Sequence, residues 1–194
     1  MNKNIIKIIL IGDTNVGKTC LVKRYLQNQY SGTENTIGLE YATRDIMIES
    51  EVVNVRIWDT AGQERFQSLV ETYFTGTDGA IIVFDICSED SFNHVPLWID
   101  KLQKKCTESP AIILVGNKLD LESKRKVSKE DVYAFAQKEQ IDYYDTSAKT
   151  GENVQDVFYQ IEHQAFRLFK EKRSKNVENK PIVRNDTQQK NCFC

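Results

Sequence analysis

The amino-acid sequence predicts an α/β fold: a six-stranded, mostly parallel sheet with one antiparallel strand and helices on both faces. Apolar runs alternate with helical patterns along the chain, which is typical of a parallel sheet covered on both sides. The runs 80–84 and 111–115 are apolar throughout, as expected of strands buried on both faces. The segments 39–48 and 52–58 are separated by too few residues for a crossover helix, so they predict the antiparallel pair.

The other elements near the N-terminus and in the middle of the chain follow from local patterns. An apolar strand at 5–11 precedes a helix-prone segment at 20–29, and a shorter strand is expected at 141–146. We expect Asn93 to be the N-cap of a helix that carries Pro96 in its first turn, where proline is tolerated.

The C-terminal third of the chain predicts two more helices followed by a polar segment without periodic structure. Ser128 begins a sequence that resembles a capping box. Apolar residues at helical spacing from Val154 to Phe169 predict a helix whose apolar side packs on the sheet. Beyond residue 173 the sequence is polar and shows no usable period. We therefore expect one folded domain at 1–173 and a flexible tail at 174–194.

Composition and charge exclude several classes of protein. The chain has 26 basic and 28 acidic residues, a net charge of −2, so no overall positive field would recruit nucleic acid. No apolar run approaches the ~20 residues of a membrane-spanning helix, and we expect no signal peptide. Cys20, Cys87 and Cys106 stand singly, without disulfide or zinc spacing, which predicts reduced thiols in the cytosol.

Residues 12–19, Gly-Asp-Thr-Asn-Val-Gly-Lys-Thr, lie between the first strand and the first helix. The pattern G-x-x-x-x-G-K-S/T in this position is typical of a phosphate-binding loop, because its glycines let backbone N–H groups approach an anion closely. Lys18 adds a positive charge for the β- and γ-phosphates, and the Thr19 hydroxyl can bind Mg²⁺. The loop predicts a P-loop NTPase fold with nucleotide contacts from Thr14, Asn15, Val16, Gly17, Lys18, Thr19 and Cys20.

The segment after the strand that ends at Trp58 carries a second group of candidate residues. Asp59 lies just past that strand, where a carboxylate can bind Mg²⁺ beside the phosphates. Gly62 has no side chain to prevent its N–H from reaching the γ-phosphate. Gln63 can orient a water for in-line attack because its amide both donates and accepts hydrogen bonds.

Two further segments indicate which base is bound. A carboxylate at Asp120 can accept hydrogen bonds from guanine N1–H and the 2-amino group, neither of which adenine offers on that edge. Asn117 can connect this loop to residues 12–19, and the methylene stem of Lys118 can cover a face of the base. The segment after the last strand would place an N–H at guanine O6; its candidate residues are Ser147, Ala148 and Lys149.

With these motifs in place, the chain resembles the Ras superfamily of small GTPases and, within it, the Rab family. The resemblance extends to the segments 37–41, 65–69, 73–76 and 90–93 and to the last three residues. It implies that Thr36 binds Mg²⁺ and the γ-phosphate and that Tyr30 flanks the base. It also implies an effector-binding surface at Ile37, Tyr41, Trp58 and Tyr73, and double geranylgeranylation of Cys192 and Cys194.

The resemblance further implies a switch that binds GTP or GDP with Mg²⁺ and regulates vesicle trafficking. Intrinsic hydrolysis is expected to be slow, on the order of 10⁻⁴ to 10⁻² s⁻¹. The segment 27–35 contains no arginine, so a GTPase-activating protein would supply one. Other implied partners are an exchange factor, a GDP-dissociation inhibitor or escort protein, and effectors. The implied location is the cytoplasmic face of endomembranes, reached through prenyl groups, in exchange with the cytosol.

Two other functions compete with this interpretation. A soluble P-loop ATPase or nucleotide kinase would share the phosphate loop, although Asp120 argues against adenine. A non-hydrolysing GTP-binding scaffold would share the fold, although the residues that bind phosphate, Mg²⁺ and water argue against it.

Overall fold

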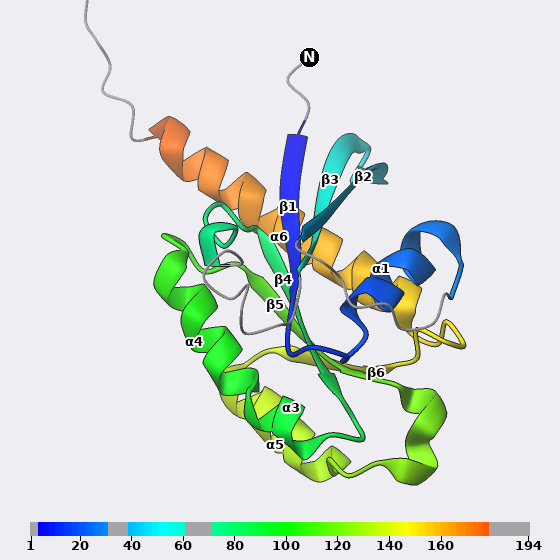
Figure 1. Cartoon of the computed structure of the whole chain (residues 1–194). Helices are drawn as coiled ribbons and strands as arrows, with labels where there is room; N and C mark the ends of the chain where they lie inside the picture. The colour runs from blue at the N-terminus through cyan, green and yellow to red at the C-terminus, as the bar shows by residue number, and fades with distance from the viewer. Residues whose placement is uncertain (1–3, 31–38, 61–70, 179–194) are drawn as a thin grey trace, which may run out of the picture.

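Six strands form one mixed sheet in the order β2-β3-β1-β4-β5-β6 in the computed structural model (Figure 1). The structure describes residues 4–30, 39–60 and 71–178. The strands are β1 (Asn4–Ile11), β2 (Leu39–Ile48), β3 (Glu51–Thr60), β4 (Gly79–Asp85), β5 (Ala111–Asn117) and β6 (Asp142–Thr146). All neighbours pair in parallel except β2, which is antiparallel to β3. The fold class predicted from the sequence is confirmed.

A tight two-residue turn joins β2 and β3. Ile48 pairs with Glu51, so only Glu49 and Ser50 lie outside the ladder. Both have positive φ, 49° and 66°, as a type I′ hairpin requires. The antiparallel pair is therefore confirmed, with a connection shorter than the three residues expected.

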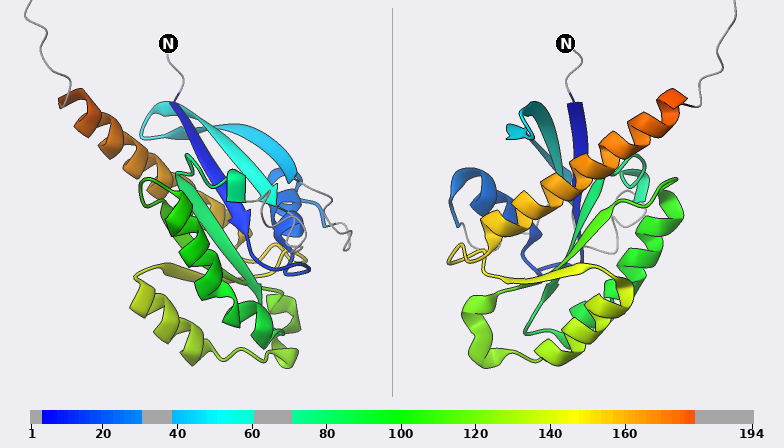
Figure 2. Two further views of the ribbon diagram at one scale, coloured as in Figure 1. Left: turned by 60° about the vertical axis from the view of Figure 1, so that its left-hand side comes forward. Right: turned by 180° about the vertical axis from the view of Figure 1, so that it is seen from behind.

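Helices cover both faces of the sheet (Figure 2). One face carries α1 (Lys18–Gln27) and α6 (Val154–Glu178), and the other carries α3 (Glu89–Asn93), α4 (Val95–Lys105) and α5 (Lys129–Glu139). A short 3-10 helix, Leu119–Lys124, follows β5. Side chains alternate across β1: Ile6 and Ile8 belong to the core under α6, and Ile9 and Ile11 belong to the core under α4.

The helix boundaries differ in places from the sequence-based expectations. Helix α1 begins at Lys18, two residues earlier than expected, and ends at Gln27 because Asn28 turns into the left-handed conformation. The expected N-cap at Asn93 is wrong: Asn93 ends α3, whose cap is Ser88, and α4 begins after His94. Pro96 does lie in the first turn of α4, as predicted.

The two C-terminal helices agree with their sequence patterns. The Ser128 hydroxyl accepts a hydrogen bond from the Asp131 N–H, which confirms the cap of α5. The apolar side of α6 is buried against the sheet, as predicted. Its backbone remains helical to Glu178, five residues past the expected domain boundary at 173. Cys20, Cys87 and Cys106 are free thiols in the part of the chain that the structure describes.

A buried acid joins α1 to α6. Glu162 is only 4% exposed, and its carboxyl group accepts a 2.6 Å hydrogen bond from the Tyr25 hydroxyl. Tyr25 stacks on Phe158, and the Arg44 guanidinium lies 5.0 Å from the centre of the Tyr25 ring. Burial raises the pKa of Glu162 to about 7, although the Tyr25 hydrogen bond and the Arg44 charge oppose this rise.

The raised pKa predicts a pH dependence of stability. Between about pH 4.5 and 7 the folded protein keeps a proton on Glu162 that the unfolded chain releases. The free energy of unfolding should therefore fall across this range as pH rises, with a contribution from this group of about 3 kcal/mol. Glu162→Gln should remove that contribution in urea unfolding series at several pH values. Glu171→Gln, at an exposed position of the same helix, should keep it. Parallel curves for wild type and Glu162→Gln would contradict the prediction.

Candidate functional site

The carboxyl edge of the sheet brings the predicted segments together. Strands β1, β3, β5 and β6 all run in the same direction, so their carboxyl ends lie at one edge (Figure 1). Open α/β sheets bind ligands along this edge. The arrangement agrees with the position of each motif at a strand end.

Both glycines of the loop 12–19 are required by its geometry. Gly12 has φ 140°, and a Cβ there would lie 2.1 Å from the Val83 carbonyl oxygen. Gly17 has φ 97°, and a Cβ there would lie 2.3 Å from the Asn117 side-chain nitrogen. Side chains at these positions would collide with the next strand and with the base-binding segment. The loop can therefore pack tightly only because both residues lack a side chain.

The ammonium group of Lys18 is enclosed by the loop. The residue is 5% exposed, and Nζ donates to the carbonyl oxygens of Gly12 at 2.8 Å and Asp13 at 2.7 Å. Burial lowers the pKa of Lys18 to about 8, while the charges of Asp59 and Asp13 act in the opposite direction. A phosphate at the loop would supply an anionic partner at close range and favour the charged form of Lys18.

Oxygen ligands of the kind that Mg²⁺ prefers lie next to Lys18. The Thr19 hydroxyl donates a 2.6 Å hydrogen bond to Asp59 Oδ2, and Asp59 is only 2% exposed. A hydroxyl at the start of α1 and a carboxylate near the end of β3, beside a phosphate loop, fit a Mg²⁺ ion that takes its remaining ligands from phosphate and water. The donor set therefore suits the predicted metal.

Asn117 connects three loops at the other end of the site. Its Nδ2 donates to the Val16 carbonyl at 2.8 Å, and its Oδ1 accepts from the Ala148 N–H at 3.2 Å and the Thr146 hydroxyl at 3.3 Å. Asn117 is 2% exposed, so these bonds are shielded from water. The predicted link between this segment and the loop 12–19 is present as a direct hydrogen bond.

The predicted base-binding side chains surround Asp120. The Ser147 hydroxyl donates to Asp120 Oδ1 at 2.7 Å, and Lys149 Nζ lies 3.7 Å from Oδ2. Lys118 has a left-handed backbone, and its Nζ lies 2.7 Å from Asp85 Oδ2. A pocket opens over this corner, lined by Asn15, Gly17, Cys20, Tyr30, Asn117, Lys118, Asp120, Leu121, Ala148 and Lys149. The structure thus places Tyr30 beside the other base-binding candidates.

The predicted effector residues within the described part of the chain form a ladder of aromatic rings. The Trp58 ring centre lies 4.9 Å from that of Tyr41 and 5.1 Å from that of Tyr73. Lys7 supports this group from β1: its Nζ lies 5.2 Å from the Trp58 ring centre and donates to the Tyr73 carbonyl. Other predicted site residues lie outside the described residues: Thr36, Ile37, Gly62, Gln63, Cys192 and Cys194.

The structure also shows contacts that the sequence patterns did not indicate. Arg24 on α1 donates to the carbonyl oxygens of Ala148 and Lys149 at 2.8 and 2.6 Å, which joins the first helix to the last loop of the site. His94 and Trp98 both bond the carboxylate of Asp13 in the phosphate loop. The sequence offers one signal for the contacts of His94 and Trp98: Asp13 is an acidic residue inside a loop that binds anions.

Comparison with known proteins identifies the family. A model of the Ras family matches residues 7–167. The chain belongs to the Ras family. It is 37% identical to the Ras-related protein Rab11D of Nicotiana tabacum over 188 residues, 96% of this chain and 81% of that protein. It is 38% identical to Rab11C of Nicotiana tabacum, over 90% of this chain and 79% of that protein. It is 37% identical to Rab11A of Lotus japonicus, over 87% of this chain and 75% of that protein.

Within the Ras family this chain is a Rab protein, a small GTPase of vesicle trafficking that hydrolyses GTP to GDP. This membership decides against the ATPase or kinase and against the non-hydrolysing scaffold.

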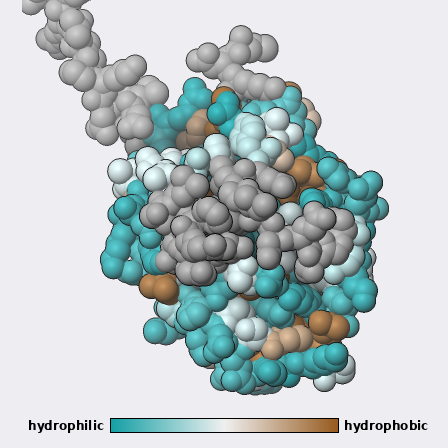
Figure 3. Space-filling view, viewed as in Figure 1, coloured by the Kyte–Doolittle hydropathy of each residue, from teal (hydrophilic) through white to brown (hydrophobic). Residues whose placement is uncertain are grey.

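Across residues 4–30, 39–60 and 71–178, no helix is both long and apolar enough to cross a membrane. On the face shown in Figure 3, hydrophobic surface occurs in small areas separated by hydrophilic surface.

Two of the glycines with a positive φ, Gly17 and Gly76, give a matched test of the phosphate loop. Gly17→Ala should lower the free energy of unfolding by about 2 kcal/mol or more and abolish GDP binding, because strain adds to the collision with Asn117. Gly76 also has a positive φ, 72°, but a Cβ there would meet no atom within 4 Å. Gly76→Ala should cost only about 1–2 kcal/mol of strain and leave GDP affinity unchanged. Urea unfolding and calorimetry measure both quantities, and equal effects of the two variants on GDP affinity would refute the prediction.

Proposed function

We propose that this Rab GTPase binds GTP and GDP with Mg²⁺ at the carboxyl edge of its sheet and uses the γ-phosphate to order two segments of the chain. The observation that carries this proposal is the hydrogen bonding of Asn117, which fixes the phosphate loop and the base-binding segments relative to each other. A nucleotide has its base and phosphates at a fixed spacing, so a site for it needs such a connection.

At the phosphate end, the backbone of the loop 12–19 and the Lys18 ammonium bind the β- and γ-phosphates. Thr19 and Asp59 would hold Mg²⁺, together with Thr36. When bound, the ion neutralises phosphate charge that would otherwise oppose attack by water. Gly62 donates its N–H to the γ-phosphate and Gln63 orients the attacking water. Loss of the γ-phosphate releases these contacts, which is the basis of the switch.

At the base end, the Asp120 carboxylate accepts two hydrogen bonds from guanine. Ser147 and Lys149 already hold this carboxylate in place, so little ordering is needed when the base binds. The Ala148 N–H, which donates to Asn117 Oδ1 in this structure, would share its hydrogen with guanine O6, while Lys118 and Tyr30 cover the faces of the base. Adenine would leave the Asp120 carboxylate without the two donors that guanine offers, which explains the selectivity.

Calorimetry with GDP and ADP tests this assignment. The wild type should bind GDP at least about 100-fold more tightly than ADP. Asp120→Ala should weaken GDP binding by about 100-fold and leave ADP binding almost unchanged, because only guanine uses the carboxylate. Asp100→Ala, which removes an exposed acid from α4, is the control and should bind both nucleotides like the wild type. Equal affinity of the wild type for GDP and ADP would exclude the proposed site.

The switch implies a set of protein partners. A GTPase-activating protein would bring an arginine to the γ-phosphate, an exchange factor would release GDP, and effectors would read the GTP-bound form. Tyr41, Trp58 and Tyr73 suit effector recognition because their rings form a continuous group, with Tyr41 half exposed. Ile37 lies close by in sequence and is proposed as part of the same surface.

We further propose that residues 1–173 form the GTP-binding domain and that the segment 174–194 attaches it to membranes. The helix α6 extends into the start of this segment, and Cys192 and Cys194 near its end would carry geranylgeranyl groups. Two lipids anchor stably where one binds only marginally. A GDP-dissociation inhibitor or escort protein would cover them during transfer between the cytosol and the cytoplasmic face of endomembranes.

Replacement of the terminal cysteines tests the anchor. Cys192→Ser/Cys194→Ser should move the protein from the membrane pellet to the supernatant in cell fractionation, without changing GDP affinity. Either single replacement should leave a partial shift, because one lipid gives weak, reversible binding. Cys106→Ser, at a half-buried thiol near α4, is the control and should fractionate like the wild type. Membrane recovery of the double variant equal to that of the wild type would contradict the lipid anchor.

A further inference from the structure

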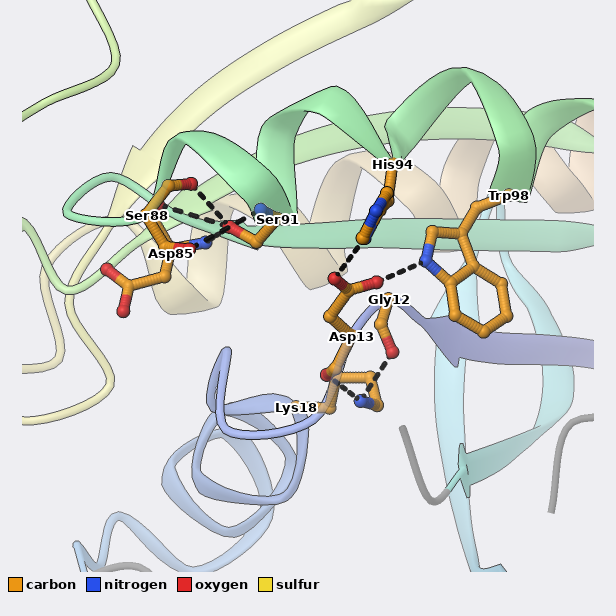
Figure 4. Close-up of polar contacts among 8 residues, drawn as sticks. All are labelled: Gly12, Asp13, Lys18, Asp85, Ser88, Ser91, His94 and Trp98. Atoms are coloured by element: carbon orange, nitrogen blue, oxygen red, sulfur yellow. Dashed lines mark hydrogen bonds and ion pairs between the residues drawn. The ribbon is translucent and has the colours of Figure 1, made fainter. Parts of the chain in front are cut away.

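The phosphate loop contains an acidic side chain that is bonded to the helix beside it. Asp13 Oδ2 lies 2.6 Å from His94 Nδ1, and Asp13 Oδ1 accepts a 2.9 Å hydrogen bond from Trp98 Nε1 (Figure 4). The Asp13 side chain is 25% exposed, and Trp98 is only 5% exposed. Both carboxylate oxygens therefore have a donor on the same neighbouring structure, the start of α4. We call this group of three residues the Asp13 clamp.

The clamp turns the carboxylate away from the centre of the loop. In Figure 4 the Asp13 carboxylate points toward α4, whereas the Lys18 ammonium lies on the other side of the loop, bonded to the carbonyl oxygens of Gly12 and Asp13. A carboxylate that faced the phosphates would repel them, because the interaction of like charges at a few ångströms is strong in a partly buried site. The clamp separates this charge from the phosphate position.

The position of His94 depends on the short helix before it. Ser88 caps α3, and His94 lies between α3 and α4. Pro96 has no N–H to continue the hydrogen-bond pattern of α3, so α3 ends before it and α4 begins at Val95. The Ser91 hydroxyl fixes α3 to the end of β4 through the Asp85 N–H. Asp85 in turn pairs with Lys118 of the base-binding segment.

We propose that the Asp13 clamp is a positioning device that slows nucleotide release by keeping the Asp13 carboxylate directed away from the bound phosphates. The inference rests on the proposed function, because it takes the loop 12–19 as the phosphate site. His94 and Trp98 do not touch the nucleotide; they act through Asp13. The clamp also connects the phosphate loop to α4 and, through α3 and Asp85, to the base-binding segment.

Dissociation of a fluorescent GDP analogue, followed by stopped flow, tests the clamp in the full-length protein. His94→Ala should raise the dissociation rate constant by about tenfold, the effect of losing one hydrogen bond to a charged group. In an Asp13→Asn background the same replacement should change the rate by less than about twofold, because the amide carries no charge to repel phosphate. Trp98→Phe keeps a buried ring without its N–H and should repeat the pattern of His94→Ala. His163→Ala, at the only other histidine, should release the analogue like the wild type.

The two backgrounds separate positioning from general loss of structure. If His94→Ala speeds release equally in the wild-type and in the Asp13→Asn background, the effect does not pass through the carboxylate and the proposal is wrong. An unchanged rate in His94→Ala also overturns it. Measurement of wild-type GDP affinity comes first: failure of the wild type to bind GDP would refute the proposed function, whereas normal binding with no effect of His94→Ala refutes the clamp alone.

Discussion

The arrangement of the nucleotide site at the carboxyl edge of the sheet depends on the side-chain amide of one residue, Asn117. It lies at the end of β5, and its three hydrogen bonds reach the loops after β1 and β6 as well as the end of β6 itself. Because the group is buried, the loss of any one bond would leave a polar atom shielded from water. Gly17 leaves the space that the amide occupies. The phosphate and base ends of the site are thus held at a constant separation by a group that need not touch the nucleotide.

Two consecutive residues of β3 connect this site to the proposed effector surface. Adjacent residues of a strand point to opposite faces, so Trp58 lies among the aromatic rings on one face while Asp59 points to Thr19 on the other. The register with β1 places them opposite Ile9 and Leu10 in the middle of the sheet. A displacement at the end of β3 would therefore affect both the proposed metal ligand Asp59 and the proposed effector surface.

Much of this structure could be predicted from local sequence, and the differences have physical causes. The strand runs, the hairpin and the strand-end motifs depend on neighbouring residues, so their patterns were sufficient. The start of α1 was misplaced because Gly17, in a left-handed conformation, lets the helix begin at Lys18. The links from Asp13 to His94 and from Tyr25 to Glu162 join residues far apart in the chain. Such pairs depend on packing between elements, and a single sequence carries no periodic signal for them.

The length and direction of α6 have a consequence for the orientation of the molecule. The helix begins beside the loop after β6, at the nucleotide edge, and its 25 residues cross one face of the sheet toward the opposite end (Figure 2). At 1.5 Å per residue it spans about 37 Å. A tether attached beyond Glu178, as proposed, would therefore pull on the end of the domain away from the nucleotide site. With the proposed lipid anchor in the tail, the nucleotide site would lie about the length of α6 from the point of attachment, where proteins approaching from the solvent could reach it.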